Sequence, residues 1–469
     1  MSFVLRSSRN PLTLNQTGLV TVTLNNPKIQ RIFIVRACLP VGRGNVPVMQ
    51  DCSENMDLKT PGLYIHIPFC ISKCLYCDFY SLTSISAVPD FLDALFKEME
   101  MYRNRFNSFD PSAAPSPALQ SRDKGALRVN PEQGSAFRPG SRRVDTVYIG
   151  GGTPSLLSPQ QLEDILKRVR KNFDLISDPE ITPEITIETN PADLNRSFLE
   201  SMREIGINRI NIGVQSFDEK VLNFLGRRHS AKQAISAVEA SRKAGFHNIG
   251  LDLIYSIPEQ DIESWLDTLK QAVAFSPEHI SCYQLTLESK THLGMRCRAG
   301  EFSLPGEELQ YEFFMKTSEF LEDAGYIHYE VSNFALGTEY TSRHNQKYWD
   351  HSPYLGLGPA AHSFQCNRRW WNHHSIDRYL ADINAGNLPI EETEILTIEQ
   401  LRLEALCLGL RTKKGVSLQD FENRYHYDLL TEKKEMLDKL KEEGFISIRD
   451  GYLYPTKTGL AIADSLALI

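Results

Sequence analysis

Six apolar strand candidates alternate with helical segments between residues 63 and 285, and this alternation restricts the fold more than any other feature of the sequence. Consecutive βα units predict a parallel sheet with helices packed outside it, which we expect to be a partial (βα)6 TIM-like barrel of the α/β class. In such folds ligands bind at the carboxyl ends of the strands. The strand candidates are LYIHI (63–67), VDTVYI (144–149), EITIE (184–188), RINIGV (209–214), NIGLDLIY (248–255) and HISCYQL (279–285).

Two segments of different composition precede and interrupt this pattern. Residues 1–50 contain five Arg and one Lys but no Asp or Glu, and we expect residues 1–55 to be a poorly ordered extension, or to precede a real start at Met56. An organelle transit peptide would share this composition, but the segment lacks a clear amphipathic helix. Residues 108–143 are rich in Pro, Ser, Ala, Gly and Arg and have no hydrophobic period, which predicts a disordered insertion.

The end of the chain has a different pattern. After about residue 390 the periodicity becomes helical, and the chain continues into FISIRDGYLYPT, which predicts two short strands joined by an Asp-Gly turn. Helices followed by such a hairpin predict a small winged-helix-like α+β domain over residues 391–469.

Composition excludes several classes of function. The 469-residue chain has a formal net charge of -8, whereas nucleic-acid binders usually carry a basic face, so nucleic acid is not an expected partner. No apolar run reaches the roughly 18 residues of a membrane span, and no secretory signal is evident. Nine cysteines, three of them within eight residues, predict metal ligation in a reducing cytoplasm rather than a disulfide framework.

Cys70, Cys74 and Cys77 follow the first strand with the spacing C-x3-C-x2-C. Three thiolates can hold three irons of a 4Fe-4S cubane and leave the fourth iron without a protein ligand. That iron can bind S-adenosylmethionine (SAM) as a chelate. An electron from the cluster then cleaves the SAM sulfonium and produces a 5'-deoxyadenosyl radical. The alternative is a zinc site, but zinc usually takes four ligands and no fourth cysteine lies close by. Tyr76 and Phe79 would shield a cluster from water.

Polar groups and glycines follow the next strands. Glycines allow the backbone to approach a small zwitterion closely, and a strand-end carboxylate would pair with the SAM ammonium group. Each group alone has a structural alternative, a tight turn or a solvated charge, but their convergence on one barrel mouth predicts a SAM pocket. The candidates are Gly151, Gly152 and Thr153 in YIGGGTPS, Glu188 in IETNP, Gln215 in NIGVQSF, Arg227 in LGRRHS and Asp252 in GLDLIYSIP.

The motifs YIHIPFC, CDF, GGGTPS, ETNP, GVQSF, GRRH and DLIYSIP together resemble those of the HemN/HemW group of radical SAM proteins, across roughly residues 62–465. The resemblance implies that the barrel is a radical SAM barrel and that Tyr64 joins the SAM-contacting residues named above. It also implies a barrel over residues 56–300, a group-specific segment over 301–390 and then the C-terminal domain.

The group contains two functional classes, and two motifs separate them. Oxygen-independent coproporphyrinogen III oxidases carry a further cysteine two residues after the third cluster ligand, where this chain has Phe79. Heme chaperones of the HemW type show CDF or CNF followed by a small residue, as in CDFYS here, and an H-N-x-x-Y-W signature. The chain has HNQKYW, which supplies His344, Asn345, Tyr348 and Trp349.

The resemblance therefore implies a heme chaperone that binds heme and transfers it to acceptor hemoproteins. The cluster and SAM would control its oligomeric state or the transfer step, an electron donor would reduce the cluster, and a homodimer is one expected assembly. Two enzymatic alternatives remain open: oxidative decarboxylation of coproporphyrinogen III, and a HemN-like radical SAM methyltransferase that holds a second SAM.

The HNQKYW segment is the candidate heme site. His344 would donate an imidazole nitrogen to heme iron, and the two aromatic side chains after it would offer flat apolar surface to the porphyrin. The alternative is a structural histidine beside core aromatics. His362, in YLGLGPAAHSF (354–364) with Gly356 and Gly358, is a second candidate ligand that we rank below His344, because a tight loop explains that segment equally well.

Overall fold

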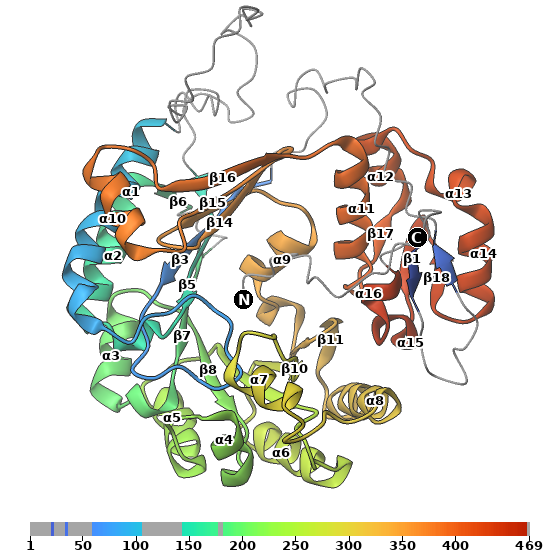
Figure 1. Ribbon diagram of the computed structural model, residues 1–469, viewed down its shortest axis with the longest axis horizontal. Coiled ribbons are helices and arrows are strands. Elements are labelled where there is room, and N and C mark those ends of the chain that lie inside the picture. Colours follow the sequence, from blue (N-terminus) through green and yellow to red (C-terminus); the bar gives the residue numbers. More distant parts are fainter. Residues whose placement is uncertain (1–19, 23–32, 36–58, 106–142, 177–181, 467–469) are drawn as a thin grey trace, which may run out of the picture.

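The computed structural model describes five stretches of the chain, drawn in colour in Figure 1. They are residues 20–22, 33–35, 59–105, 143–176 and 182–466. Within the predicted N-terminal extension, β1 (Val20–Val22) pairs antiparallel with β2 (Phe33–Val35). The rest of that extension and nearly all of the insertion predicted over residues 108–143 lie outside the described residues.

Six parallel strands form the barrel, in the order in which they occur along the chain. All six predicted strands are present, with their ends shifted by two residues or fewer, so the predicted partial barrel is confirmed. The strands are β3 (Gly62–Ile67), β5 (Thr146–Gly151), β7 (Glu184–Thr189), β8 (Arg209–Gln215), β9 (Ile249–Tyr255) and β10 (His279–Gln284).

Side chains along these strands alternate between the helix-covered outside and the barrel interior. In β3, Leu63, Ile65 and Ile67 belong to the main hydrophobic core, whereas the Tyr64 hydroxyl and the His66 ring are hydrogen-bonded to each other. The outward positions therefore supply the apolar core, and the inward positions are left to polar and aromatic side chains.

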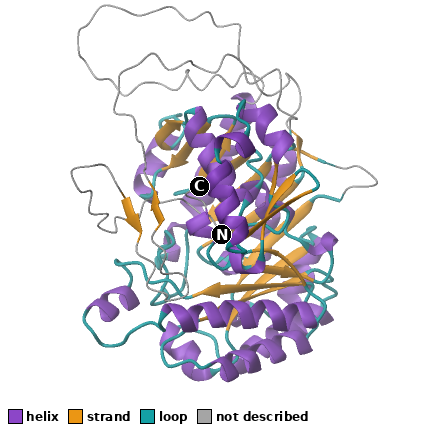
Figure 2. Ribbon diagram, turned by 90° about the vertical axis from the view of Figure 1, so that its right-hand side faces the viewer, coloured by secondary structure: helices purple, strands orange, loops and turns teal. Residues whose placement is uncertain are grey.

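Helices cover the outside of the barrel as a layer against the strands (Figures 1 and 2). Polar caps fix where two of them begin: Ser158 with Gln161, and Ser230 with Gln233, each form a reciprocal capping box. The helices are α1 (Val88–Arg105), α2 (Pro159–Asn172), α3 (Arg196–Glu204), α4 (Glu219–Leu225), α5 (Ala231–Lys243), α6 (Ile262–Ala274) and α8 (Glu307–Asp323).

The sheet continues beyond the barrel on both sides, to twelve strands. One edge gains β12 (Asn333–Ala335) and β11 (Ile327–Glu330). Next to β3 lie β13 (Tyr354–Leu357), β14 (His362–Gln365), β15 (Arg368–Asn372) and β16 (Ile390–Ile395), with α10 (Ile376–Asn384) between the last two. The tight-loop alternative for residues 354–364 is therefore wrong, because β13 pairs in parallel with β3 and only residues 358–361 form a turn.

The C-terminal unit has a hydrophobic core separate from that of the barrel, to which Phe364 of β14 also contributes. Its hairpin turns at Asp450 and Gly451, both with positive φ, as the Asp-Gly signal predicts, and the winged-helix-like outline is confirmed. The predicted boundary at residue 391 falls inside β16. The elements are α11 (Ile398–Gly409), β17 (Val416–Ser417), α12 (Leu418–Tyr425), α13 (Leu429–Glu432), α14 (Lys434–Glu442), β18 (Ile446–Arg449), β19 (Tyr452–Pro455), α15 (Lys457–Leu460) and α16 (Ala463–Leu466).

Backbone hydrogen bonds attach this unit to the barrel. The Val331 amide donates to the Arg411 carbonyl at 2.9 Å, and the Lys413 amide donates to the Tyr329 carbonyl at 2.9 Å. Glu322 of α8 adds ion pairs with C-terminal lysines. Among the described residues, no helix combines the length and the apolarity that a membrane span needs.

Candidate cluster and SAM site

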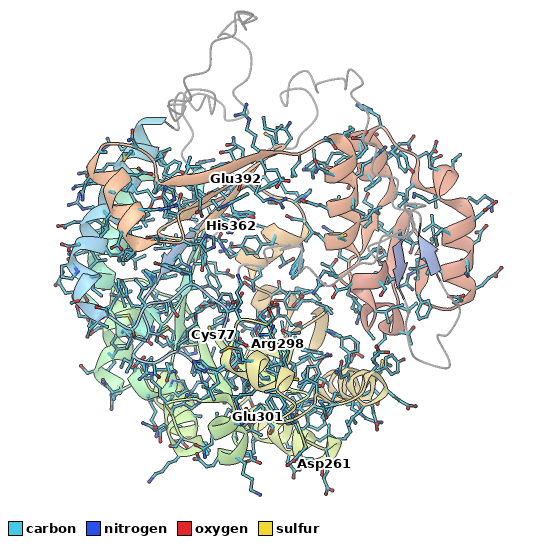
Figure 3. The ribbon with its side chains drawn as sticks, viewed as in Figure 1. Cys77, Asp261, Arg298, Glu301, His362 and Glu392 are labelled. Carbon is cyan, nitrogen blue, oxygen red and sulfur yellow. The ribbon has the colours of Figure 1, made fainter. Side chains whose placement is uncertain are left out.

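The three cysteines lie on the loop between β3 and α1, and backbone hydrogen bonds join that loop to itself and to two other segments. The Cys70 amide donates to the Leu82 carbonyl at 2.9 Å, and the Leu75 amide to the Leu225 carbonyl at 3.1 Å. The Leu75 carbonyl accepts from Leu293 in α7 (His292–Arg298) at 2.9 Å. Figure 3 shows Cys77 near the centre of the ring of strands.

Two of the thiols accept hydrogen bonds from residues that the SAM motifs supply. Arg227 Nη1 lies 3.3 Å from Cys74 Sγ and Nη2 donates to the Gly213 carbonyl at 2.8 Å. Thr153 Oγ1 donates to Cys70 Sγ at 3.4 Å. Donors to the sulfurs stabilise the negative charge of an iron-sulfur cluster, so both side chains fit a cluster site.

In a 4Fe-4S cubane each thiolate binds a different iron, so three cysteines leave one iron without a protein ligand. No group of three His, Cys, Asp or Glu side chains among the described residues is close enough to hold one metal ion. Burial raises the pKa of the Cys77 thiol to about 11, which means that cluster binding displaces a proton there.

The glycine motif brings β5 against the cluster loop. The Gly152 amide donates to the Ile67 carbonyl at 2.8 Å and the Thr153 amide to the Phe69 carbonyl at 2.7 Å. A Cβ atom at Gly152 would lie 2.6 Å from the Phe69 oxygen, so the position requires glycine. The motif's contact with SAM stays a prediction, because its Gly152 and Thr153 amides already donate to the β3 end and the cluster loop.

Two carboxylates, those of Glu188 and Asp252, lie near each other on β7 and β9. Glu188 accepts from the Tyr148 hydroxyl at 2.7 Å and from the Gly151 amide at 3.1 Å. Asp252 is partly buried with its Oδ1 atom enclosed, and burial of the carboxyl group, followed by the negative charge of Glu188, raises its pKa to about 6. Gln215 ends β8 with a φ of 65° and is buried. The structure therefore brings the predicted strand-end groups together, and paired carboxylates suit a cationic ligand.

Helix α9 (Arg343–Trp349), which carries the HNQKYW segment, closes the opposite, amino end of the barrel. The Arg343 and His344 amides each donate to Glu184, the first residue of β7, at 3.0 Å. Lys347 forms an ion pair with Asp145 at 2.8 Å. The cluster loop follows the carboxyl end of β3, so the structure separates the two predicted sites by the length of the barrel.

His344 is enclosed in this position, with 1% of its surface exposed. Its Nδ1 lies 2.9 Å from the Thr146 hydroxyl and its Nε2 3.0 Å from the Tyr348 hydroxyl. The ring also stacks on Tyr148 at 5.2 Å, beside Tyr64 at 6.5 Å. Iron could bind either ring nitrogen only after one of these hydrogen bonds is lost.

Of the other predicted heme residues, Asn345 and Trp349 are buried as well, and Tyr348 is partly buried. Asn345 is 8% exposed, and Trp349 lies beneath the Arg411 guanidinium at 5.5 Å. By contrast, His362 is partly exposed and stacks on Trp371 with ring centroids 5.5 Å apart, on the side of the sheet that faces the centre of the molecule (Figure 3). His362 is thus the more accessible of the two candidate ligands.

Several interior residues were missed by the sequence analysis. Three of them point into the barrel from strands that were predicted as apolar segments: Tyr148, Arg209 and His279. The signal that would have found them is the alternation itself, which places polar residues at every second position of a strand.

A three-cysteine loop after the first strand of a partial (βα)6 barrel, with polar strand ends converging on it, defines the class of radical SAM proteins. The model of the radical SAM superfamily matches residues 64–272, and that of the HemN C-terminal domain matches residues 396–462. Within this class the chain belongs to the HemW family, as its relatives show.

Two curated relatives cover most of both chains. The heme chaperone HemW of Lactococcus lactis is 33% identical over 78% of this chain and 86% of its own length. The heme chaperone HemW of Bacillus subtilis is 31% identical over 86% of this chain and 97% of its own length. Among solved structures, coproporphyrinogen III oxidase (HemN) from Escherichia coli superposes with a TM-score of 0.69 over 88% of this chain and 90% of that one, at 21% identity. That likeness shows a shared fold.

Proposed function

We propose that this protein is a heme chaperone, which binds heme and transfers it to acceptor hemoproteins. The observation that carries the proposal is the near full-length similarity to curated heme chaperones, 31–33% identical in the two cases given above. Phe79 supports it, because the oxidases of the group carry a cysteine at that position. Phe79 is 39% exposed, so a cysteine there would have been accessible to a ligand.

The cluster and SAM would occupy the mouth of the barrel. Cys70, Cys74 and Cys77 would hold the cluster, whose reduction supplies the electron for SAM cleavage. Arg227 would keep its hydrogen bond to the thiolate sulfur. The other residues proposed to contact SAM are Tyr64, Gly151, Gly152, Thr153, Glu188, Gln215 and Asp252.

The heme site is proposed at HNQKYW (His344, Asn345, Tyr348 and Trp349), with His362 as the second candidate. His344 would have to exchange for iron either its hydrogen bond with Tyr348, within α9, or its hydrogen bond with Thr146 of the barrel. His362 lies outside α9 and is partly exposed. Replacing each histidine by alanine and measuring heme affinity and unfolding in parallel separates the candidates, because a ligand variant loses heme while its fold persists.

The proposal also includes a cellular setting. Free thiols that must bind iron suit a reducing compartment such as the cytoplasm. An electron donor would dock near the cluster, where Ile71 and Phe79 are exposed. A change between monomer and homodimer would couple cofactor binding to transfer.

A transfer experiment tests the function. Cluster-reconstituted protein is loaded anaerobically with one equivalent of heme and mixed with an apo-hemoprotein, and the absorbance spectrum is followed with and without SAM. We expect the acceptor's holo spectrum to appear at the chaperone's expense, and a Cys74→Ser variant to change the rate. No heme binding, or binding without any transfer, would refute the proposal.

A further inference from the structure

Two tyrosines lie side by side in the interior of the barrel. Tyr64 on β3 and Tyr148 on β5 are directly opposite each other in the pairing of the two parallel strands, and their ring centroids are 6.2 Å apart. Together with Ala361 they form a small buried cluster, in which 4% of Tyr64 and 2% of Tyr148 is exposed. Tyr64 belongs to the proposed SAM site, whereas Tyr148 has no role in it so far.

Both hydroxyl groups point towards the carboxyl end of the barrel, where the cluster loop lies. The Tyr148 hydroxyl donates to Glu188 Oε1 at 2.7 Å, and the Tyr64 hydroxyl lies 3.0 Å from His66 Nδ1. Tyr148 is level with Thr186 on β7, so Glu188 is the next inward position of that strand, as His66 is on β3. Each hydroxyl is therefore bonded to the layer of side chains just above its own.

The partners of the two hydroxyls meet at Gly151, a predicted SAM contact. The Gly151 amide donates to Glu188 Oε2 at 3.1 Å. On its other side, a Cβ atom at Gly151 would lie 2.6 Å from His66 Nδ1. Only one side chain thus separates each tyrosine hydroxyl from the residue at which we expect SAM.

The hydrogen bonds fix which atom carries each hydrogen. His66 Nε2 lies 2.9 Å from the Tyr80 carbonyl, which can only accept, so Nε2 donates there and Nδ1 accepts from Tyr64. Burial lowers the pKa of His66 to about 4, which keeps the ring neutral. Burial also holds the pKa of Tyr148 well above its usual value, so its hydroxyl stays protonated. Both tyrosines present an intact O–H group, held in place by a base.

We propose that Tyr64 and Tyr148 are hydrogen-atom donors that quench the 5'-deoxyadenosyl radical formed at the mouth when no substrate is present to receive it. One tyrosine gives the hydrogen atom of its hydroxyl, proton and electron together, to the radical carbon. The O–H bond breaks, a stronger C–H bond forms, and the products are 5'-deoxyadenosine and a phenoxyl radical. One electron from the donor that reduces the cluster and one proton from water then restore the tyrosine.

The inference rests on the proposed SAM site and on the proposed chaperone function. A chaperone that holds SAM at a reducible cluster offers the radical no substrate. Enclosure of the two rings suits a transient phenoxyl radical, because a site without water prevents side reactions of reactive intermediates.

The test uses cluster-loaded protein with SAM and dithionite in deuterated water, without heme or porphyrinogen. Hydroxyl groups exchange with this solvent and C–H groups do not, so a tyrosine donor adds a single deuterium to 5'-deoxyadenosine, which mass spectrometry detects. We expect deuterated 5'-deoxyadenosine from the native chain. We also expect freeze-quenched samples to show the electron paramagnetic resonance signal of a phenoxyl radical.

Replacing both tyrosines identifies the donors. The double variant Tyr64→Phe with Tyr148→Phe should lose the phenoxyl signal and the added deuterium. Tyr255→Phe is the matched control, because Tyr255 is also a buried tyrosine of the barrel but its ring packs on Trp265 of α6. It should behave like the native chain. A protein with difluorotyrosine in place of both residues retains the two hydroxyls, and fluorine splitting of its signal would assign the radical to them even if the double variant does not fold.

The outcomes separate the inference from the proposed function. The inference is overturned if the native chain gives 5'-deoxyadenosine without deuterium, if the double variant keeps the phenoxyl signal, or if the difluorotyrosine protein shows no fluorine splitting. It is also overturned if the native chain binds SAM and cleaves none of it, while heme transfer still decides the chaperone function. If the native chain binds no SAM, the SAM site is refuted together with the inference.

Discussion

Replacing His344 by alanine should strongly destabilise the barrel. The imidazole is buried, hydrogen-bonded at both nitrogens and stacked on Tyr148. Deleting a buried ring typically costs about 3–5 kcal/mol. The substitution also leaves the Thr146 and Tyr348 hydroxyls without this partner, at about 1–3 kcal/mol for each one that stays unsatisfied. We therefore expect a loss of at least about 4 kcal/mol, a large fraction of the stability of a domain.

The assay is anaerobic urea unfolding of the cluster-free protein, followed by far-UV circular dichroism. His362→Ala is the matched control, because its partly exposed ring stacks on Trp371 and should cost about 1 kcal/mol. A His344→Ala protein within about 1 kcal/mol of the native chain would refute the reasoning. In that case the hydrogen bonds described here would not hold α9 to the barrel.

Three further substitutions have defined outcomes. Gly150→Ala places a Cβ atom 2.9 Å from Glu188 Oε2, so we expect it to weaken SAM binding severalfold in equilibrium dialysis while the cluster absorbance persists. Burial raises the pKa of Glu98 from 4.5 to about 7, so stability should fall by up to about 3 kcal/mol as pH rises from 4.5 to 7, and Glu98→Gln should flatten that slope in urea titrations. Arg227→Met removes the donor to Cys74 Sγ, so the reduction potential of the reconstituted cluster should become more negative, and an unchanged potential would contradict the role of that hydrogen bond.

The sequence predicted the parts of the fold that depend on local pattern. Apolar runs located the six barrel strands, and Asp450-Gly451 located the C-terminal turn, because both signals act over a few residues. The extension from β13 to β16 was missed, because its strands are only four to six residues long and do not form apolar runs like those of the barrel. Short strands of this kind are defined by their partners in the sheet.

The residues of the candidate site likewise fall into those that the sequence could predict and those that it could not. The cysteine loop and the strand-end groups could be placed from sequence because parallel strands bring their carboxyl ends to one mouth. The position of His344 at the other end could not be foreseen, because it depends on α9 packing against Glu184 and Thr146, far away in the sequence. Arg209 was overlooked for a related reason, since an inward arginine resembles a strand-end surface charge until the register is known.

The most direct test of the proposed function is turnover. Cluster-reconstituted protein is incubated anaerobically with SAM, a reductant and coproporphyrinogen III, and the products are identified by mass spectrometry. We predict no decarboxylated product, while heme and SAM binding to the same preparation persist. Catalytic formation of protoporphyrinogen would contradict the chaperone proposal and make the protein an oxidase despite Phe79.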